Sequence, residues 1–218
     1  MSDFSTRRVT MVDTQVRPSD VTKFPIIAAM LHVPREVFVP DAAREAAYAG
    51  QNLTLAPGRV VLEPRTLAKM LDALDIQPTD RVLVVGAGLG YGPALVAQMA
   101  GAVVALEEDA VLAQGASLRL GTLDKGGRVE LTIGPLAKGA ADRGPFDVIL
   151  IEGGVETVPE ALIRQLAEGG RIAAIFMTGA LGVAKLGMMQ SGAVSWRFAF
   201  NAAAPVLPGF QVQRSFAL

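Results

Sequence analysis

The spacing of apolar and polar positions changes along the chain, and the change predicts where a sheet begins. From Arg81 onward, short apolar runs alternate with segments of helical spacing. This alternation is typical of a mostly parallel sheet with helices on both faces. The predicted strands are 81–85, 102–107, 128–133, 146–151 and 171–176, and the predicted helices are 91–100, 109–121 and 158–168. We therefore expect an α/β core in this part of the chain.

The segment before the core has a different pattern. Helical spacing predicts helices at 23–33 and 65–74, and four prolines between them predict a largely irregular connection. At the other end, 196–200 and 210–216 alternate apolar and polar residues, which predicts two half-buried antiparallel strands. Residues 179–193 are rich in glycine and alanine and predict a weak helix or a loose connection. We expect residues 1–78 to form an extension packed on a core of residues 79–218.

Composition narrows the function classes. The chain has no cysteine and one histidine, which excludes thiol nucleophiles and argues against a metal site. Twenty basic and twenty-one acidic residues give a net charge of -1, so no basic field attracts nucleic acid. Without a signal-peptide pattern or an 18-residue apolar run, we expect a cytoplasmic protein with no membrane partner. The oligomeric state stays open.

A glycine-rich turn follows the first core strand. Gly86, Gly88 and Gly90 come after the apolar run 82–85, and the second strand ends at Glu107 and Glu108. This order, which is a strand, a glycine turn, a helix, a strand and an acid, is typical of a nucleoside pocket. The glycines let a ligand approach the backbone, and the carboxylate binds both ribose hydroxyls. Glu107 closes its strand directly and is the candidate ribose ligand, whereas Glu108 suits the start of the next helix.

The glycine spacing favours one ligand. A dinucleotide motif would place its third glycine at position 91, where this chain has Tyr91. The tighter Gly86-x-Gly88-x-Gly90 spacing is typical of S-adenosylmethionine (SAM) pockets. A nucleotide-dependent oxidoreductase stays an alternative because Gly92 is adjacent.

Five segments, in order, resemble the protein-L-isoaspartate (D-aspartate) O-methyltransferase family. The segment 33–40, Val-Pro-Arg-Glu-Val-Phe-Val-Pro, is similar to the family's Pro-Arg-Glu-x-Phe-Val-Pro element. The other four segments are 11–15, 47–48, 82–91 and 159–171. The resemblance implies a class I SAM-dependent methyltransferase fold, which is Rossmann-like, with an antiparallel C-terminal strand. It also implies an enzyme that forms methyl esters on isomerised aspartyl residues in protein repair.

The same resemblance implies a set of site residues. The implied substrate is a protein or peptide that carries a carboxylate. Because a carboxylate is already ionised at neutral pH, the reaction needs no strong base. No catalytic residue is assigned. The cofactor contacts implied are Gly86, Ala87, Gly88, Gly90, Tyr91, Glu107, Gly134, Pro135 and Leu136, and the substrate loop comprises Arg59, Leu62, Glu63 and Pro64.

Three positions depart from the family pattern. Leu62 stands where the family has a serine, and it can neither donate nor accept a hydrogen bond. Val84 and Pro135 stand where the family has acids. Each lost hydrogen bond is expected to weaken SAM binding by about 0.5–1.5 kcal/mol. The alternatives are therefore a SAM-binding or regulatory protein on the same fold, or a methyltransferase for another acceptor.

Overall fold

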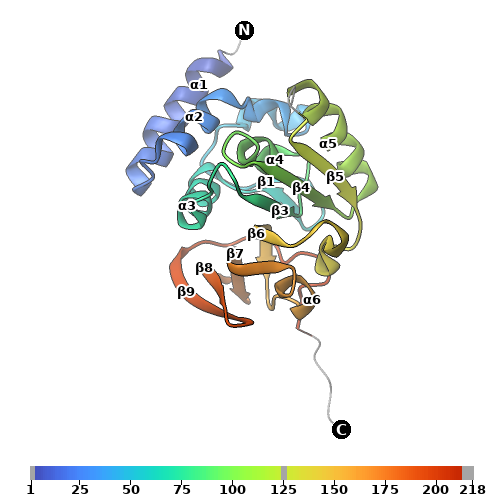
Figure 1. Cartoon of the computed structure of the whole chain (residues 1–218). Helices are drawn as coiled ribbons and strands as arrows, with labels where there is room; N and C mark the ends of the chain where they lie inside the picture. Colours follow the sequence, from blue (N-terminus) through green and yellow to red (C-terminus); the bar gives the residue numbers. More distant parts are fainter. Residues whose placement is uncertain (1–2, 124–126, 213–218) are drawn as a thin grey trace.

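The computed structural model describes residues 3–123 and 127–212. Seven strands form one sheet in the order β5-β4-β3-β6-β7-β8-β9. The pairs from β5 to β7 are parallel, and β8 and β9 add antiparallel strands at one edge (Figure 1). The strands are β3 (Arg81–Val85), β4 (Ala102–Glu107), β5 (Val129–Ile133), β6 (Phe146–Val155), β7 (Leu166–Thr178), β8 (Leu181–Gln190) and β9 (Ala193–Asn201). This sheet confirms the predicted fold class.

Among the described residues, six helices accompany the sheet: α1 (Phe4–Met11), α2 (Phe24–His32), α3 (Pro64–Leu74), α4 (Tyr91–Val96), α5 (Ala110–Leu123) and α6 (Glu160–Ile163). The predicted helices at 23–33 and 65–74 are α2 and α3, and each has a proline in its first turn, where a missing N–H does no harm. Short helical turns cover 12–16, 17–19, 35–37, 41–46, 136–138 and 141–143. Within the described residues, no helix is both long and apolar enough to cross a membrane.

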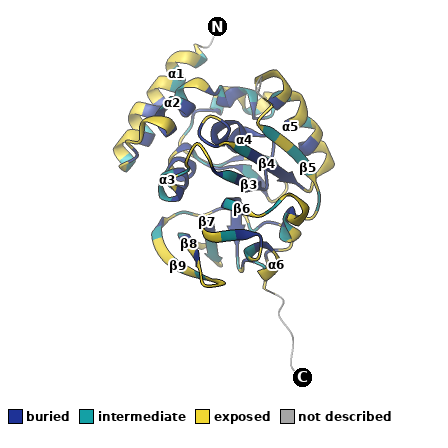
Figure 2. Cartoon of the chain, viewed as in Figure 1, coloured by how far each residue is buried: buried dark blue, intermediate teal, exposed yellow. Residues whose placement is uncertain are grey.

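Alternate residues of β3 face opposite sides of the sheet. Val82 and Val84 join a large apolar cluster with α2, α3 and α4, whereas Leu83 and Val85 join a second cluster with α6 and the segment 206–210. Residues on both sides of position 78 share the first cluster. Of the parallel strands, β3, β4 and β6 are mostly buried and the edge strand β5 is partly exposed, as are the outer faces of α1 and α5 (Figure 2). The boundary at residue 78 stays a prediction.

Two segments differ from the sequence-based expectations in type. Residues 179–193, expected to be a weak helix or a loose connection, contain β8. Their glycines fit a crowded strand, because a methyl group on Gly182 would clash with the Ala202 carbonyl oxygen and one on Gly187 would press on Val194. The predicted strand 210–216 is wrong over 210–212, which lie outside any strand, and its remainder falls outside the described residues.

Three further elements differ in length. The predicted helix 158–168 shrinks to α6, because β7 already begins at Leu166 and pairs with β6. The predicted helix 91–100 ends at Val96. In the other direction, β6 continues to Val155, four residues beyond its predicted end. Pairing between β6 and β7, which sequence periodicity does not report, accounts for the ends of α6 and β6.

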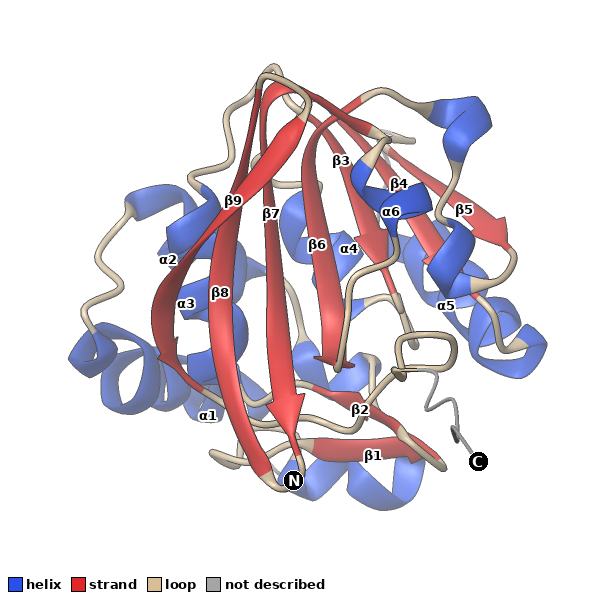
Figure 3. Cartoon of the chain, turned by 90° about the horizontal axis from the view of Figure 1, so that it is seen from below, coloured by secondary structure: helices blue, strands red, loops and turns tan. Residues whose placement is uncertain are grey.

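A small hairpin covers the carboxyl end of the sheet. β1 (Leu53–Ala56) and β2 (Arg59–Val61) pair with each other in a separate two-stranded sheet, where irregular structure was expected. Figure 3 shows them lying across the ends toward which the arrows of β6 and β7 point. From β3 the chain adds β4 and β5 on one side and then crosses over to add β6 and β7 on the other side. The strand order therefore reverses between β3 and β6. In open α/β sheets, ligands bind beside such a reversal.

Candidate functional site

The glycine turn lies at this end of the sheet, directly after β3. Gly86, Gly88 and Gly90 have φ angles of +82°, +57° and +99°, in the left-handed region that glycine adopts without strain. The N–H groups of Gly86 and Ala87 donate to the carbonyl oxygen of Leu106, at 2.9 and 3.1 Å. The turn is therefore fixed to the neighbouring strand β4, and Gly90 is the N-cap residue of α4.

Glu107 ends β4 beside this turn and is fully buried. Its Oε2 atom accepts a hydrogen bond from the N–H of Gly88 at 2.7 Å. Its Oε1 atom accepts from the N–H groups of Glu108 and Asp109, at 2.9 and 3.0 Å. The carboxylate that the sequence predicts to bind a ribose is thus held at the glycine turn by these hydrogen bonds.

Arg59 lies against the same carboxylate. Its Nη1 and Nη2 atoms donate to Glu107 Oε1 and Oε2, each at 2.6 Å, and the arginine is 5% exposed. Paired guanidinium–carboxylate bonds of this kind are among the strongest side-chain hydrogen bonds. The sequence placed Arg59 in a loop facing the acceptor; the structure places its side chain on the predicted ribose ligand.

Two leucines fill the space beside the turn. A methyl group placed on Gly88 would lie 2.7 Å from Leu55 Cδ1, and one placed on Gly86 would lie 3.3 Å from Leu207 Cδ1. The same position on Gly86 is 3.4 Å from Arg59 Nη2. In this conformation the residues present do not fit SAM, because both Glu107 oxygens are bonded to Arg59 and the adjoining space holds side chains.

The predicted adenine residues lie near Glu107. The N–H of Gly134 donates to the Glu107 carbonyl oxygen at 3.0 Å, and that of Leu136 donates to Glu108 Oε2 at 3.2 Å. Pro135 lies between them and precedes a short helical turn. Glu108, which the sequence assigned to a helix start, therefore holds this loop in place.

The rest of the predicted substrate loop anchors the hairpin. Leu62 is fully buried, and its carbonyl oxygen accepts from Arg35 Nη2 at 2.8 Å. Glu63 Oε1 accepts from Thr66 Oγ1 at 2.6 Å, and Pro64 begins α3. The structure thus brings Arg59 to the glycine turn and uses Leu62, Glu63 and Pro64 at the base of the hairpin.

Glu152, in β6, is a buried acid that the sequence analysis missed. It is 5% exposed, and burial raises the pKa of its carboxyl to about 8, although Arg35 and Arg59 oppose this shift. The neighbouring Glu107 adds to the rise. Its sequence signal is an acid that interrupts the apolar run of a strand just before Gly153.

Glu152 belongs to a buried polar cluster under the turn. Glu152 Oε1, the Tyr91 hydroxyl and Arg35 Nη1 have no hydrogen-bond partner among the described residues. The Arg35 guanidinium lies 4.9 Å from the centre of the Tyr91 ring. Burial lowers the pKa of Arg35 and raises that of Tyr91. Buried polar atoms without partners are destabilising, so this cluster is a weak point of the core.

Gly92→Ala tests how tightly Glu152 is held. The new methyl group would fall on Glu152 Oε1, so the side chain must move within a packed core. We expect the free energy of unfolding to drop by about 1–3 kcal/mol in urea denaturation. Gly121→Ala in α5 is the control, because no described atom beyond the adjoining residues and the nearby backbone of α5 lies within 4 Å of its methyl position. An unchanged unfolding midpoint for Gly92→Ala would contradict the packing described.

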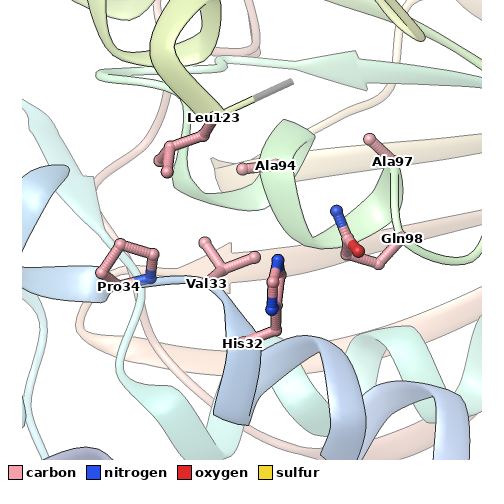
Figure 4. A pocket seen from close by; sticks show the side chains of 7 residues that line it. All are labelled: His32, Val33, Pro34, Ala94, Ala97, Gln98 and Leu123. Atoms are coloured by element: carbon pink, nitrogen blue, oxygen red, sulfur yellow. The ribbon is translucent and has the colours of Figure 1, made fainter. Parts of the chain in front are cut away.

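A separate small cavity lies between α2 and α4 (Figure 4). Its volume is about 30 Å³, and it is lined by His32, Val33, Pro34, Ala94, Ala97, Gln98 and Leu123. That space admits water and is far too small for a nucleoside. His32 therefore lies at a cavity that is distinct from the glycine turn. In the described part of the chain, no three His, Cys, Asp or Glu side chains are placed to hold a metal.

Known proteins with similar sequences point to one family. Residues 8–179 match the family described as protein-L-isoaspartate(D-aspartate) O-methyltransferase. A protein-L-isoaspartate O-methyltransferase of Methylorubrum extorquens (strain PA1) is 41% identical over 170 residues, covering 78% of this chain and 74% of that protein. Another, from Koribacter versatilis (strain Ellin345), is 38% identical over 172 residues, covering 79% and 77%.

Two solved structures are similar in fold. One protein-L-isoaspartate O-methyltransferase has a TM-score of 0.80 and 22% identity, over 93% of this chain and 66% of that chain. The second, from Plasmodium falciparum, is in complex with S-adenosyl-L-homocysteine (SAH) and is described as a putative enzyme of the same name. It has a TM-score of 0.77 and 18% identity, over 95% of this chain and 99% of that chain. At these identities the two structures support the fold alone.

Proposed function

Because this chain belongs to the protein-L-isoaspartate (D-aspartate) O-methyltransferase family of SAM-dependent enzymes, we propose that it methylates a carboxylate of isomerised aspartyl residues in proteins. The observation that carries the proposal is the family match over residues 8–179, which includes the glycine turn, Glu107 and the hairpin. The proposal extends to a cytoplasmic location, which suits a chain without cysteine.

The chemistry suits the residues present. An acceptor carboxylate is ionised at neutral pH, so the chain needs no general base to activate it. The chain's task would be to align the reactants and to exclude water. Because position 62 is a leucine, the proposed site has no hydroxyl group at this position.

A methyl-transfer assay tests the proposal. We expect transfer of a radioactive methyl group from SAM to a peptide with one isoaspartyl residue, and at least about tenfold less transfer to the same peptide with aspartate, in line with a site that aligns one isomer. The base-labile ester is counted after release as methanol. Equal transfer to the two peptides, or transfer to neither, would overturn the proposed substrate.

A further inference from the structure

We propose that Arg59 occupies the position of the cofactor's ribose, so that SAM enters only when the β1–β2 hairpin moves away from the glycine turn. The inference rests on the proposed function for the identity of the ligand. In this proposal Arg59 lowers the affinity for the cofactor, because it competes with the ribose for the carboxylate oxygens of Glu107.

The competition follows from hydrogen-bond geometry. A ribose offers two neighbouring hydroxyl donors to a carboxylate, and the guanidinium of Arg59 offers two parallel N–H donors to the same oxygens of Glu107. Each oxygen also accepts from at least one backbone N–H of the turn or of residues 108–109. Because Glu107 is buried and both of its oxygens already accept these hydrogen bonds, it cannot bind Arg59 and a ribose at the same time.

The hairpin carries two of the three side chains that fill the site, Leu55 and Arg59, and Leu207 is the third. Leu55 lies on β1 and Arg59 begins β2, and these strands pair with each other rather than with the seven-stranded sheet. Movement of the hairpin would therefore remove the leucine from Gly88 and the arginine from Glu107 at once. Leu53 and Val61 hold the ends of the hairpin nearest its base in the core, and the part beyond them is the part suited to local opening.

The base and the tip of the hairpin are held differently. At the base, Asn52 Nδ2 donates to the Ala203 carbonyl oxygen at 2.9 Å, and Asn52 Oδ1 accepts from the N–H of Glu63 at 2.8 Å. At the tip, Pro57 and Gly58 are exposed, and beyond the two adjoining residues no described atom lies within 4 Å of a methyl group placed on Gly58. The tip can therefore swing about the fixed base once Arg59 leaves Glu107.

Apparent affinity then depends on the open fraction. A ligand that binds only the open state has an apparent Kd equal to its intrinsic Kd divided by the fraction of open protein. The ion pair keeps that fraction low. Removal of the Arg59 charge should raise it while leaving the three backbone bonds to Glu107 in place.

Calorimetric titration with SAH, the demethylated product, tests the inference. Arg59→Gln and Arg59→Ala are expected to bind SAH at least about tenfold more tightly than the wild type. Arg59→Lys keeps a charge and is expected to fall between them and the wild type. Arg65→Gln is the matched control, because Arg65 is a half-exposed arginine six residues away, and it should bind as the wild type does. Equal or weaker binding by both Arg59→Gln and Arg59→Ala would overturn the inference.

A second measurement needs no substitution. A crystal structure of the wild-type chain with SAH is expected to show Arg59 separated from the Glu107 carboxylate. An intact Arg59–Glu107 pair beside the bound nucleoside would contradict the inference. Failure of the proposed function can be told apart from failure of this inference, because the proposed function is tested by methyl transfer. If Arg59→Gln binds SAH more tightly but no ester forms, the proposed substrate is rejected and the role of Arg59 is retained.

Discussion

Glu107→Ala is expected to lower the free energy of unfolding by about 3–5 kcal/mol, because it leaves the Arg59 guanidinium buried without its partner. Arg59 is 5% exposed and donates both of its terminal nitrogens to Glu107. The substitution also removes the acceptor of the backbone N–H groups of Gly88, Glu108 and Asp109. Urea denaturation of the purified variant measures the change.

A double-mutant cycle separates the ion pair from other effects of the substitution. Arg59→Met combined with Glu107→Leu replaces the pair with apolar side chains, and such replacements are often close to neutral. The double variant should therefore lose much less stability than the sum of the two single changes. Additive losses, or a Glu107→Ala variant within about 0.5 kcal/mol of the wild type, would show that the pair is not the buried contact described.

Glu152 is expected to make stability fall as the pH rises from about 4.5 to about 8. Its pKa is raised by burial from 4.5 to about 8, so the folded chain binds a proton across this window that the unfolded chain releases. Stability is highest below the unfolded pKa and is lost as the folded group ionises. One such group contributes at most about 1.4 kcal/mol per pH unit, and several kcal/mol over the window. Denaturation of the wild type and of Glu152→Gln at a series of pH values measures the difference.

The comparison cancels groups that are common to both proteins. The stability of Glu152→Gln relative to the wild type should rise with pH across the window and level off above it. Glu160→Gln, at a carboxyl whose side chain is 78% exposed, should follow the wild-type slope. Parallel pH profiles for the wild type and Glu152→Gln would show that Glu152 is not the buried acid described.

The sequence predicted those parts of the fold that depend on local pattern. The apolar runs of β3 and β4, the glycine turn and Glu107 follow one another within 27 residues, so spacing alone places them. β8 escaped prediction because its glycines serve a close approach to residues distant in sequence, such as Ala202. Helix and strand ends differed where β6 and β7 lengthen by pairing with each other.

The candidate site was predictable only in part, for the same reason. Arg59 and Glu107 are 48 residues apart, and no local motif indicates that one would bind the other. Leu62 was noted as a departure from the family pattern, and the structure gives it a fully buried place at the base of the hairpin. Glu152 was visible as an acid in an apolar strand, but its burial depends on Gly92 leaving room for it.

Two substitutions at one contact test the central claim most directly. If Glu107 is the ribose ligand and Arg59 competes for it, Arg59→Gln should strengthen SAH binding in calorimetry, and adding Glu107→Gln to that variant, in which no ion pair is left to break, should weaken it again. The account predicts a dissociation constant for Arg59→Gln below the wild-type value and one for the double variant above that of Arg59→Gln. No tightening by Arg59→Gln, or no loss of affinity on adding Glu107→Gln, would contradict it.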